Sequence, residues 1–342
     1  MNNYYIIILN WNGWSDTENC IKSILQNTNS NNYKIILVDN GSQQDEVNLI
    51  ENYCYNNFNV VISENKDFFL APKFDFPLDY EETDSKDKII LIKNNENLGF
   101  ANGNNVALKF LQNIKAQFAL LLNNDTEIGE DALDKMFNFL ISHYDSNIAA
   151  VVPQIRYFKP KDIIWNCGGN INWLGIRKYF YPNQNIKNVP QKGHMRIDYG
   201  TGCALLLDLN KTGVLCDKFF FGEEDMELAF RLKKLNLSTY CLFDSVVFHK
   251  VGSSREKISE EKMGNMVFHY SMRMSDLKSH LSKPVWYLSF FAHYCSSIRI
   301  LYSEEFFAFH KINSMWKDIY SNTKNIDYYK REDFLRISNK KY

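Results

Sequence analysis

The side chains best placed for chemistry in this chain follow the apolar run of the stretch QFALLLNNDT at 117–126. Phe118 to Leu122 is unbroken and apolar, which is typical of a strand buried on both faces of a parallel sheet. The polar triplet 123–125 follows, at the strand end where open α/β sheets bind ligands. Asp125 there suits Mg²⁺ or Mn²⁺, which bridge protein carboxylates to substrate phosphates. Alternatively, Asp125 or Thr126 is the N-cap of the next helix.

Other apolar runs also end in polar residues that could join Asp125. They are Asn10, Trp11 and Asn12 after the first run, Asp39 after the second, and His249 after a later one. Loops that leave parallel strands emerge at one sheet edge, so we expect these residues to converge. Asp39 either accepts from N3–H of a uracil or thymine ring, or caps a helix or forms a turn. His249 is either a metal ligand beside Asp125, leaving positions open for a diphosphate, or a hydrogen-bonded core histidine.

Four carboxylates crowd the start of a predicted helix in the segment GEEDME at 222–227. Their mutual repulsion favours a raised pKa for at least one of them, and a carboxylate of raised pKa in a cleft is a usual general base. Alternatively, they only complement the positive end of the helix dipole. Arg231 is spaced to pair with Glu227 along the same helix.

The segment NNENLGFANGNN at 94–105 combines small residues with many amide donors. Asn97, Gly99 and Asn104 are therefore candidates for contact with a ribose or phosphate, together with Asn124. Neither the Gly-x-Gly-x-x-Gly fingerprint nor the P-loop lysine motif is present, which argues against a dehydrogenase and a P-loop ATPase.

The elements that must position these residues alternate along the first half of the chain. Strand-like runs are separated by helical patterns, which predicts a doubly wound, mostly parallel sheet flanked by helices. The runs lie at 4–9, 33–38, 58–62, 88–92, 118–122 and 148–152. The first helix has capping-box spacing at 15–18, and the second an apolar side that includes Leu49. Residues 64–87 read as an inserted surface loop. From 153 the chain changes to short, aromatic-rich β pieces, which predict a region on the side of the acceptor substrate rather than a separate domain.

Composition narrows the class of protein. The formal net charge of -1 over 342 residues gives no electrostatic footprint for nucleic acid. Seven cysteines without a Cys-x-x-Cys pair argue against a disulfide framework and a structural zinc site. The start of the chain has no signal-peptide pattern, so we expect a cytoplasmic protein.

The last part of the chain, from 257, is predicted to be a helical extension. Residues 284–310 are dense in aromatic and aliphatic side chains, but Arg299 and His293 are among the polar residues that interrupt them. The apolar stretch is therefore too short for a membrane span. It predicts either a helical hairpin packed on the domain or an interfacial amphipathic helix that gives peripheral membrane association.

Seven motifs occur in a characteristic order between about residues 4 and 255: LNWNG, VDNGS, NENLGFANGNN, LLNNDT, GTGCALLLD, FFFGEEDMELAFRL and FHKVGS. In order and spacing they resemble a family-2 glycosyltransferase with the GT-A fold. The resemblance is closest to the bacterial rhamnosyltransferase-like branch that builds surface polysaccharides such as capsule and lipopolysaccharide.

The resemblance implies a glycosyltransferase domain at 1–256 and an extension at 257–342. The nucleotide-binding half would cover about 1–126 and the acceptor half about 127–256. Asp125 and His249 correspond to ligands of Mg²⁺ or Mn²⁺, although Asn123 replaces the first aspartate of the family's metal motif. The family's Glu-Asp motif corresponds to Glu224 and Asp225, with Asp225 as catalytic base. Residues of the first two loops would surround the nucleotide: Asn10, Trp11, Asn12 and Asp39. A downstream Tyr-x-x-Arg-Asn segment is matched only in part, at 270–274.

The implied activity is an inverting, metal-dependent transfer from a nucleoside-diphosphate sugar to a hydroxyl of a saccharide or lipid-linked saccharide. The donor would be a dTDP- or UDP-sugar, dTDP-rhamnose being one such donor. A sugar-nucleotide nucleotidyltransferase would need a basic, glycine-rich loop after the first strand, and residues 10–15 hold no Lys or Arg. A non-catalytic glycan-binding protein on the same fold stays open as an alternative.

Overall fold

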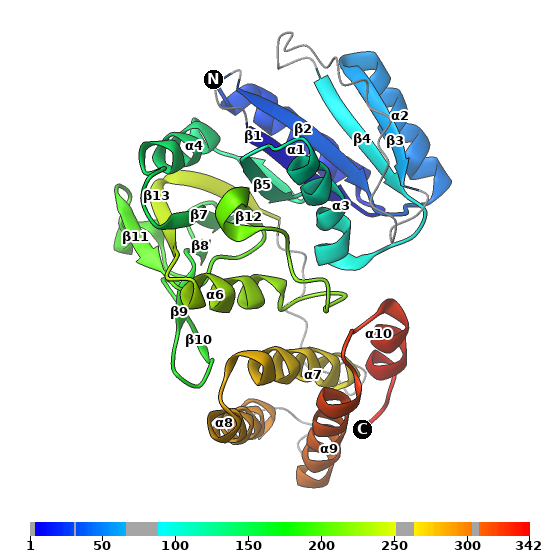
Figure 1. Cartoon of the computed structure of the whole chain (residues 1–342), viewed down its shortest axis with the longest axis vertical. Coiled ribbons are helices and arrows are strands. Elements are labelled where there is room, and N and C mark those ends of the chain that lie inside the picture. The colour runs from blue at the N-terminus through cyan, green and yellow to red at the C-terminus, as the bar shows by residue number, and fades with distance from the viewer. Residues whose placement is uncertain (1–3, 31, 66–87, 251–262, 303–307) are drawn as a thin grey trace.

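The computed structural model describes residues 4–30, 32–65, 88–250, 263–302 and 308–342. Most of the inserted loop expected at 64–87 lies outside the described residues, as does the expected boundary between domain and extension near 256. Figure 1 shows an α/β domain, coloured blue to yellow, and a group of helices in orange and red below it.

The first half of the domain alternates strands and helices as the sequence predicts. Its elements are β1 (Tyr4–Asn10), α1 (Trp14–Asn27), β2 (Tyr33–Asp39), α2 (Gln44–Asn57), β3 (Asn59–Asn65), β4 (Lys88–Asn94), α3 (Gly99–Asn113) and β5 (Phe118–Asn123).

The second half consists mainly of strands, and several are only three or four residues long. Its elements are β6 (Thr126–Ile128), α4 (Ala132–Ser142), β7 (Ile148–Tyr157), β8 (Ile164–Asn166), β9 (Gly169–Ile171), β10 (Arg177–Tyr179), the 3₁₀ turn η2 (Ile186–Asn188), β11 (His194–Ile197), β12 (Ala204–Asp208), α5 (Leu209–Thr212), α6 (Glu224–Lys234) and β13 (Ser238–His249).

One large sheet joins the two halves in the order β11-β13-β7-β12-β5-β1-β2-β4-β3. The strands β3, β4, β2, β1 and β5 are parallel, so the loops after β1, β2 and β5 leave at one edge. Strand β12 runs antiparallel to both β5 and β7, and β13 pairs parallel with β7. The mostly parallel, doubly wound sheet is confirmed.

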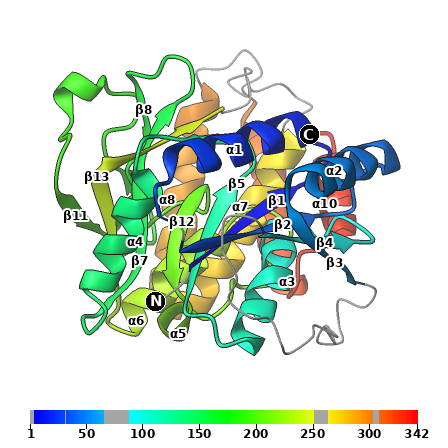
Figure 2. The same ribbon diagram turned by 90° about the horizontal axis from the view of Figure 1, so that it is seen from above.

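Alternate side chains of β1 enter two different cores, one on each face of the sheet. Ile6 and Ile8 pack with residues of α1, α2 and α4, whereas Ile7 packs with residues of α3, α5 and α6. Because every second side chain of a strand faces the same side, the continuous apolar run fills both cores. The view from above shows α1 and α3 on opposite sides of the strands (Figure 2).

The C-terminal extension is helical, as expected, and has its own hydrophobic core. It contains α7 (Met263–His280), α8 (Lys283–Tyr302), α9 (Phe309–Asn325) and α10 (Arg331–Ser338). Phe219 of the domain is part of that core and stacks on Tyr329. Ser289 of α8 also donates to the carbonyl of Leu174 at 2.7 Å, so the extension packs on the domain as the first of the two alternatives predicts. None of the described helices has the length and hydropathy needed to cross a bilayer.

Three local predictions are wrong. The capping box at 15–18 is not formed, because α1 already begins at Trp14 with Gly13 as a cap that has no side chain. Leu49 is 51% exposed, since α2 is covered by the sheet along a narrower stripe than its sequence suggests. Asp131 is the N-cap of α4, so the alternative that makes Asp125 or Thr126 a helix cap fails.

Candidate functional site

The loops after β1 and β2 are tied to each other by a network of side-chain hydrogen bonds. Asn10 lies opposite Asp39 in the parallel register, and its Nδ2 donates to Oδ1 of Asp39 at 3.3 Å and to Oγ of Ser42 at 3.2 Å. The Oδ1 of Asn12 accepts from the backbone N–H of Gln43 at 2.8 Å. The convergence expected for Asn10, Asn12 and Asp39 is therefore present.

Asp39 and Trp11 occupy opposite extremes of exposure in these loops. Asp39 is 1% exposed, and its Oδ2 accepts from the backbone N–H of Ser42 at 3.2 Å, as expected for a turn former. A carboxylate has about four acceptor positions, so this turn leaves capacity for a base N–H. Trp11 is 51% exposed and its ring is available for stacking. That these residues bind a nucleotide stays a prediction.

The loop after β5 is fixed against the start of α1. Nδ2 of Asn124 donates to Oγ1 of Thr17 at 3.0 Å and to the carbonyl of Gly13 at 3.3 Å. Oγ1 of Thr17 in turn donates to Oδ1 of Asn10 at 2.7 Å. The amide of Asn124 thus connects the third loop to the network of the first two.

Asp125 and His249 are in contact although 124 residues separate them. The pairing of β6 with β13 is antiparallel and sets Thr126 opposite His249, which brings the preceding Asp125 to the imidazole. Nε2 of His249 lies 3.1 Å from Oδ2 and 3.0 Å from Oδ1 of Asp125. The ring of Trp165 packs edge-on against the imidazole, with centroids 4.4 Å apart.

This pair fits a divalent cation that is shared with a substrate. The carboxylate and Nε2 face one another, and Nδ1 of His249 is buried without a hydrogen-bond partner in the described chain. No cluster of three His, Cys, Asp or Glu side chains able to hold a metal occurs among the described residues. A cation held by Asp125 and His249 would take diphosphate oxygens among its further ligands. That this pair binds a metal stays a prediction.

The acidic turn at the start of α6 forms the second part of the site. Oη of Tyr199 donates to Oδ2 of Asp225 at 2.7 Å, while Oε2 of Glu224 is buried and has no hydrogen-bond partner among the described residues. The short segment from Tyr199 to Cys203 connects this turn to the loop after β5, because the carbonyl of Cys203 accepts from the N–H of Asn123 at 2.8 Å. Both parts of the site thus border the same segment.

Burial and neighbouring charges shift the pKa values of the carboxylates in this turn in different directions. Burial and the neighbouring Asp225 raise the pKa of Glu224 to about 8. Burial also raises the pKa of Asp225, against the opposing effects of Arg177 and the hydrogen bond from Tyr199. For Glu223, burial is outweighed by Arg273, so its pKa is lowered. The predicted raised carboxylate is thus present.

Three residues that sequence reasoning did not single out for the site surround the acidic turn. They are Tyr199, Arg177 and Arg273. Arg273 contacts Glu223 from α7, and the guanidinium of Arg177 lies 5.3 Å from the centroid of the Tyr199 ring. Only Arg273 had a signal in the sequence, namely the partial motif at 270–274. Arg177 comes from a short hairpin that no sequence pattern places near α6.

The start of α3 serves mainly to hold neighbouring loops. Oδ1 of Asn97 accepts from Nδ2 of Asn40 at 3.1 Å, and a side chain on Gly99 would overlap the carbonyl of Phe220. Asn104 is 2% exposed and donates to the carbonyl of Phe100 within its own helix. Ribose or phosphate contacts from Asn97, Gly99 and Asn104 therefore stay a prediction.

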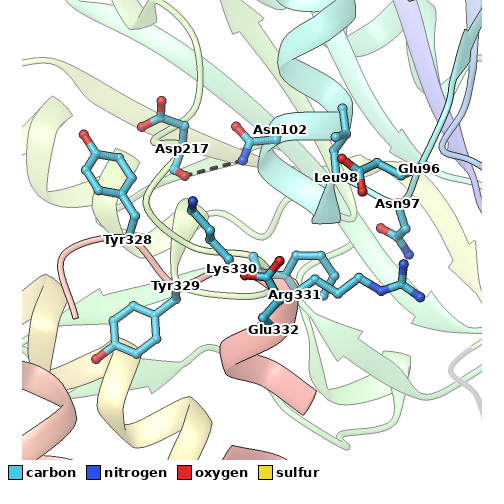
Figure 3. Close-up of a pocket in the computed structure, with 11 residues that line it drawn as sticks. Glu96, Asn97, Leu98, Asn102, Asp217, Tyr328, Tyr329, Lys330, Arg331 and Glu332 are labelled. Atoms are coloured by element: carbon cyan, nitrogen blue, oxygen red, sulfur yellow. Dashed lines mark hydrogen bonds between the residues drawn. The ribbon is translucent and has the colours of Figure 1, made fainter. Parts of the chain in front are cut away.

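A cavity of about 330 Å³ lies where the extension meets the domain. Figure 3 shows its lining residues, with Asn97 and Asn102 on the α3 side and the segment 328–332 of the extension opposite them. Nδ2 of Asn102 donates to the carbonyl of Asp217 at 3.5 Å on its wall. The extension therefore reaches the start of α3, and Asp125 and His249 are not among the lining residues.

Residues 5–71 match the model of the family described as Glycosyl transferase family 2. The matched part contains the loops after β1 and β2, with Asn10 and Asp39. No curated protein matches the sequence significantly.

Several solved structures share the fold over nearly the whole chain. GalNAc-T7, crystallised with UDP, GalNAc and Mn²⁺, is 13% identical with a TM-score of 0.58, over 98% of this chain and 56% of that one. The mannosyltransferase PcManGT of Pyrobaculum calidifontis, in complex with GDP-Man and Mn²⁺, is 11% identical with a TM-score of 0.51, over 94% and 87%. Residues 1–349 of S. aureus TarS are 11% identical with a TM-score of 0.54, over 98% and 83%.

The fold is of the GT-A type. The family match covers residues 5–71, which is less than half of the chain, and the solved structures show the fold. The chain spans 56% of the length of GalNAc-T7, and at this level of identity the likeness concerns the fold alone.

Proposed function

We propose that this protein is an inverting, metal-dependent glycosyltransferase that moves a hexosyl group from a nucleoside-diphosphate sugar to an acceptor hydroxyl. The observation that carries the proposal is the contact between Asp125 and His249 at the sheet edge where Asn10 and Asp39 also lie. A carboxylate and an imidazole in direct contact, beside loops suited to a nucleotide, would supply two ligands of a cation that also binds a diphosphate.

The donor end of the site consists of the loops after β1, β2 and β5. Trp11 would stack on the base, Asp39 would accept from its N3–H, and Asn124 would keep the loop before Asp125 in place. This chemistry favours a pyrimidine nucleotide, so we propose a UDP- or dTDP-sugar, with dTDP-rhamnose as one donor to test. Asp125 and His249 would hold Mn²⁺ or Mg²⁺, which neutralises the charge of the departing diphosphate.

The acceptor end consists of the acidic turn. Asp225 would accept the proton of an acceptor hydroxyl, whose oxygen then forms a bond to the anomeric carbon from the face opposite the diphosphate. The bond between that carbon and the diphosphate oxygen breaks, and the nucleoside diphosphate leaves with the electron pair. Glu224 keeps its proton at neutral pH because its pKa is raised to about 8, which suits a hydrogen-bond donor to the acceptor rather than the base.

For the acceptor we propose a saccharide or lipid-linked saccharide of a surface polysaccharide, reached at a membrane surface. On α8, Tyr287, Leu288 and Phe291 are 46%, 54% and 64% exposed, and the helix contains no acidic residue. Such a face suits the headgroup region of an anionic bilayer. Replacing Leu288 and Phe291 by Ser together should reduce sedimentation with anionic vesicles, and unchanged sedimentation would count against membrane association.

Incubation with UDP- and dTDP-sugars, Mn²⁺ and a saccharide acceptor tests the proposed activity. The expected products are nucleoside diphosphate and a glycoside of inverted anomeric configuration. A donor at about 100 times its dissociation constant should stabilise the fold by about 2.7 kcal/mol, measured by thermal denaturation. Pyrophosphate exchange in place of diphosphate release would indicate a nucleotidyltransferase, and no turnover of any donor would indicate a non-catalytic protein.

The change Asp125→Ala should abolish the Mn²⁺-dependent stabilisation by the donor and lower transfer, because the remaining imidazole cannot hold the cation alone. Asp145→Ala, which removes an exposed carboxylate from the loop after α4, is the control and should leave both unchanged. Transfer that persists in excess EDTA would remove the metal from the proposed mechanism.

A further inference from the structure

Glu223 connects the acidic turn to the helical extension. It is 5% exposed, and its backbone at the N-cap of α6 is left-handed, with φ of +73°. Both of its carboxylate oxygens accept from Arg273 of α7, one from Nε and the other from Nη2. Two-point contacts between arginine and a carboxylate fix orientation as well as adding energy.

Arg177 extends this contact toward Asp225. Its Nη2 lies 4.0 Å from Oε1 of Glu223, and its guanidinium lies over the ring of Tyr199, which donates to Asp225. A continuous series of contacts therefore runs from α7 of the extension to the carboxylate of Asp225. Strand β10, the segment before β12 and helix α7 each contribute one member.

The left-handed backbone of Glu223 needs such support. A residue other than glycine in this conformation costs on the order of 1–3 kcal/mol, which the surroundings must offset. No side-chain hydrogen bond caps α6 at this position, so among the described residues the support comes from the ion pair with Arg273, with Arg177 at the longer distance of 4.0 Å. Because Glu223 is followed directly by Glu224 and Asp225, a change in its backbone would redirect both carboxylates.

We propose that Arg273 is a positioning residue for transfer: through Glu223, the helical extension holds Asp225 where it can accept the acceptor proton. The inference rests on the proposed function, in which Asp225 is the base. It assigns the extension a part in catalysis that is separate from any attachment to a membrane. Misplacement of a reacting group by about 1 Å can cost about 10²-fold in rate.

The charges around Asp225 make the role measurable by pH. Arg177 and Tyr199 face Asp225 from the hairpin and from the segment before β12, Arg273 faces it from α7, and Glu223 and Glu224 precede it in the same turn. His269 of α7 also faces Glu223. Arg273 lowers the pKa of Asp225 and Glu223 raises it. Loss of Arg273 should therefore raise the pKa of Asp225 and move the acid limb of the pH profile of kcat to higher pH.

Arg273→Met, Glu223→Gln and the double variant, each in the full chain, test the inference. We expect kcat to fall about 10²-fold in Arg273→Met, with the KM of the donor changed less than about twofold. The double variant should be no slower than the slower single variant, because the two residues act as one unit. Arg273→Lys should recover part of kcat, since it restores the charge without the two-point contact.

Glu227→Gln is the matched control, because it removes a carboxylate of the same helix whose partner is Arg231. It should leave kcat and the acid limb unchanged. Thermal denaturation identifies any variant that fails to fold, and Glu223→Gln, which keeps the shape of its side chain, then continues the test. The inference would be overturned if Arg273→Met kept both the kcat of the wild type and the acid limb of its pH profile. Losses in kcat that multiply in the double variant would overturn it as well. A wild-type chain that transfers no sugar would contradict the proposed function instead.

Discussion

Asp225 differs from the other carboxylates of its turn in the partners around it. It accepts a hydrogen bond from Tyr199 and lies near Arg177, whereas Oε2 of Glu224 has no partner among the described residues. The two adjacent acids are thus divided into one that ionises more readily and one that keeps its proton. Such a division assigns acid and base roles in many active sites.

Replacement of the proposed base gives the most direct prediction at this scale. Asp225→Asn should lower kcat by about 10²- to 10⁴-fold, because the amide cannot accept the acceptor proton. Stabilisation by donor and Mn²⁺ should persist, since the proposed metal ligands Asp125 and His249 are untouched. Steady-state kinetics and thermal denaturation with donor measure the two quantities, and normal turnover would show that another residue is the base.

Glu224 should make stability depend on pH. Its pKa is near 4.5 when unfolded and is raised to about 8 in the fold. The unfolded chain therefore releases this proton first as pH rises, and stability that is present below pH 4.5 is lost toward pH 8. Relative to wild type, Glu224→Gln should gain up to about 1.4 kcal/mol in unfolding free energy per pH unit in this window.

Urea denaturation at several pH values between 5 and 8 measures this gain. Glu227→Gln, from the same helix, controls for the loss of a charge. A difference between Glu224→Gln and wild type that stays constant with pH would contradict the prediction.

At the scale of elements, the close approach of α3 to the segment before α6 joins the two halves of the domain. Gly99 has φ of +81°, and an added Cβ would overlap the carbonyl oxygen of Phe220. The N–H of Phe100 donates to that same carbonyl at 3.1 Å. Glycine is needed here both for its backbone conformation and for the missing side chain.

Gly99→Ala and Gly193→Ala separate these two needs. Gly193 also has a positive φ, +84°, but no atom lies within 4 Å of its added Cβ. Gly193→Ala should cost about 1–2 kcal/mol from backbone strain alone. Gly99→Ala should cost clearly more in urea denaturation and should also lower kcat, because Phe220 is displaced near the acidic turn. Equal losses of unfolding free energy in the two variants would mean that the contact between Gly99 and the carbonyl of Phe220 is not tight.

At the scale of the whole molecule, the extension is a folded unit with a domain residue in its core. Trp316 is 4% exposed, packs against Phe290 and Tyr294, and donates from Nε1 to Ser297 at 2.8 Å. Phe219 of the domain joins the same cluster. Loosening the extension should therefore also affect the segment that leads into α6.

Trp316→Ala should lower the unfolding free energy by about 3–5 kcal/mol, because it leaves a cavity in this core. Phe291→Ala on the exposed face of α8 is the control and should change it by less than about 0.5 kcal/mol. Urea denaturation followed by circular dichroism measures both. A loss of less than about 1 kcal/mol in Trp316→Ala would mean that the extension contributes little to global stability.

Much of the proposed donor side was predictable because its signals are local. Apolar runs of five or six residues precede Asn10, Asp39 and the polar triplet that ends in Asp125. These runs mark strands with polar ends, and parallel pairing then brings those ends to one edge. Crowding along a few residues likewise predicted a raised pKa for at least one of the four carboxylates, and burial, the larger cause, raises that of Glu224. Helix ends were less predictable, as the absent capping box of α1 shows.

The proposed acceptor side depended on contacts between residues far apart in the sequence. Arg177, Tyr199 and Arg273 meet Glu223 and Asp225 because a hairpin, a strand end and a helix of the extension pack around one turn. The sequence alone determined which side chains end the buried strands, because period and hydrophobicity are properties of short segments. Only the tertiary structure decided which cations surround the carboxylates, because the pairing of buried charges follows from packing across the whole chain.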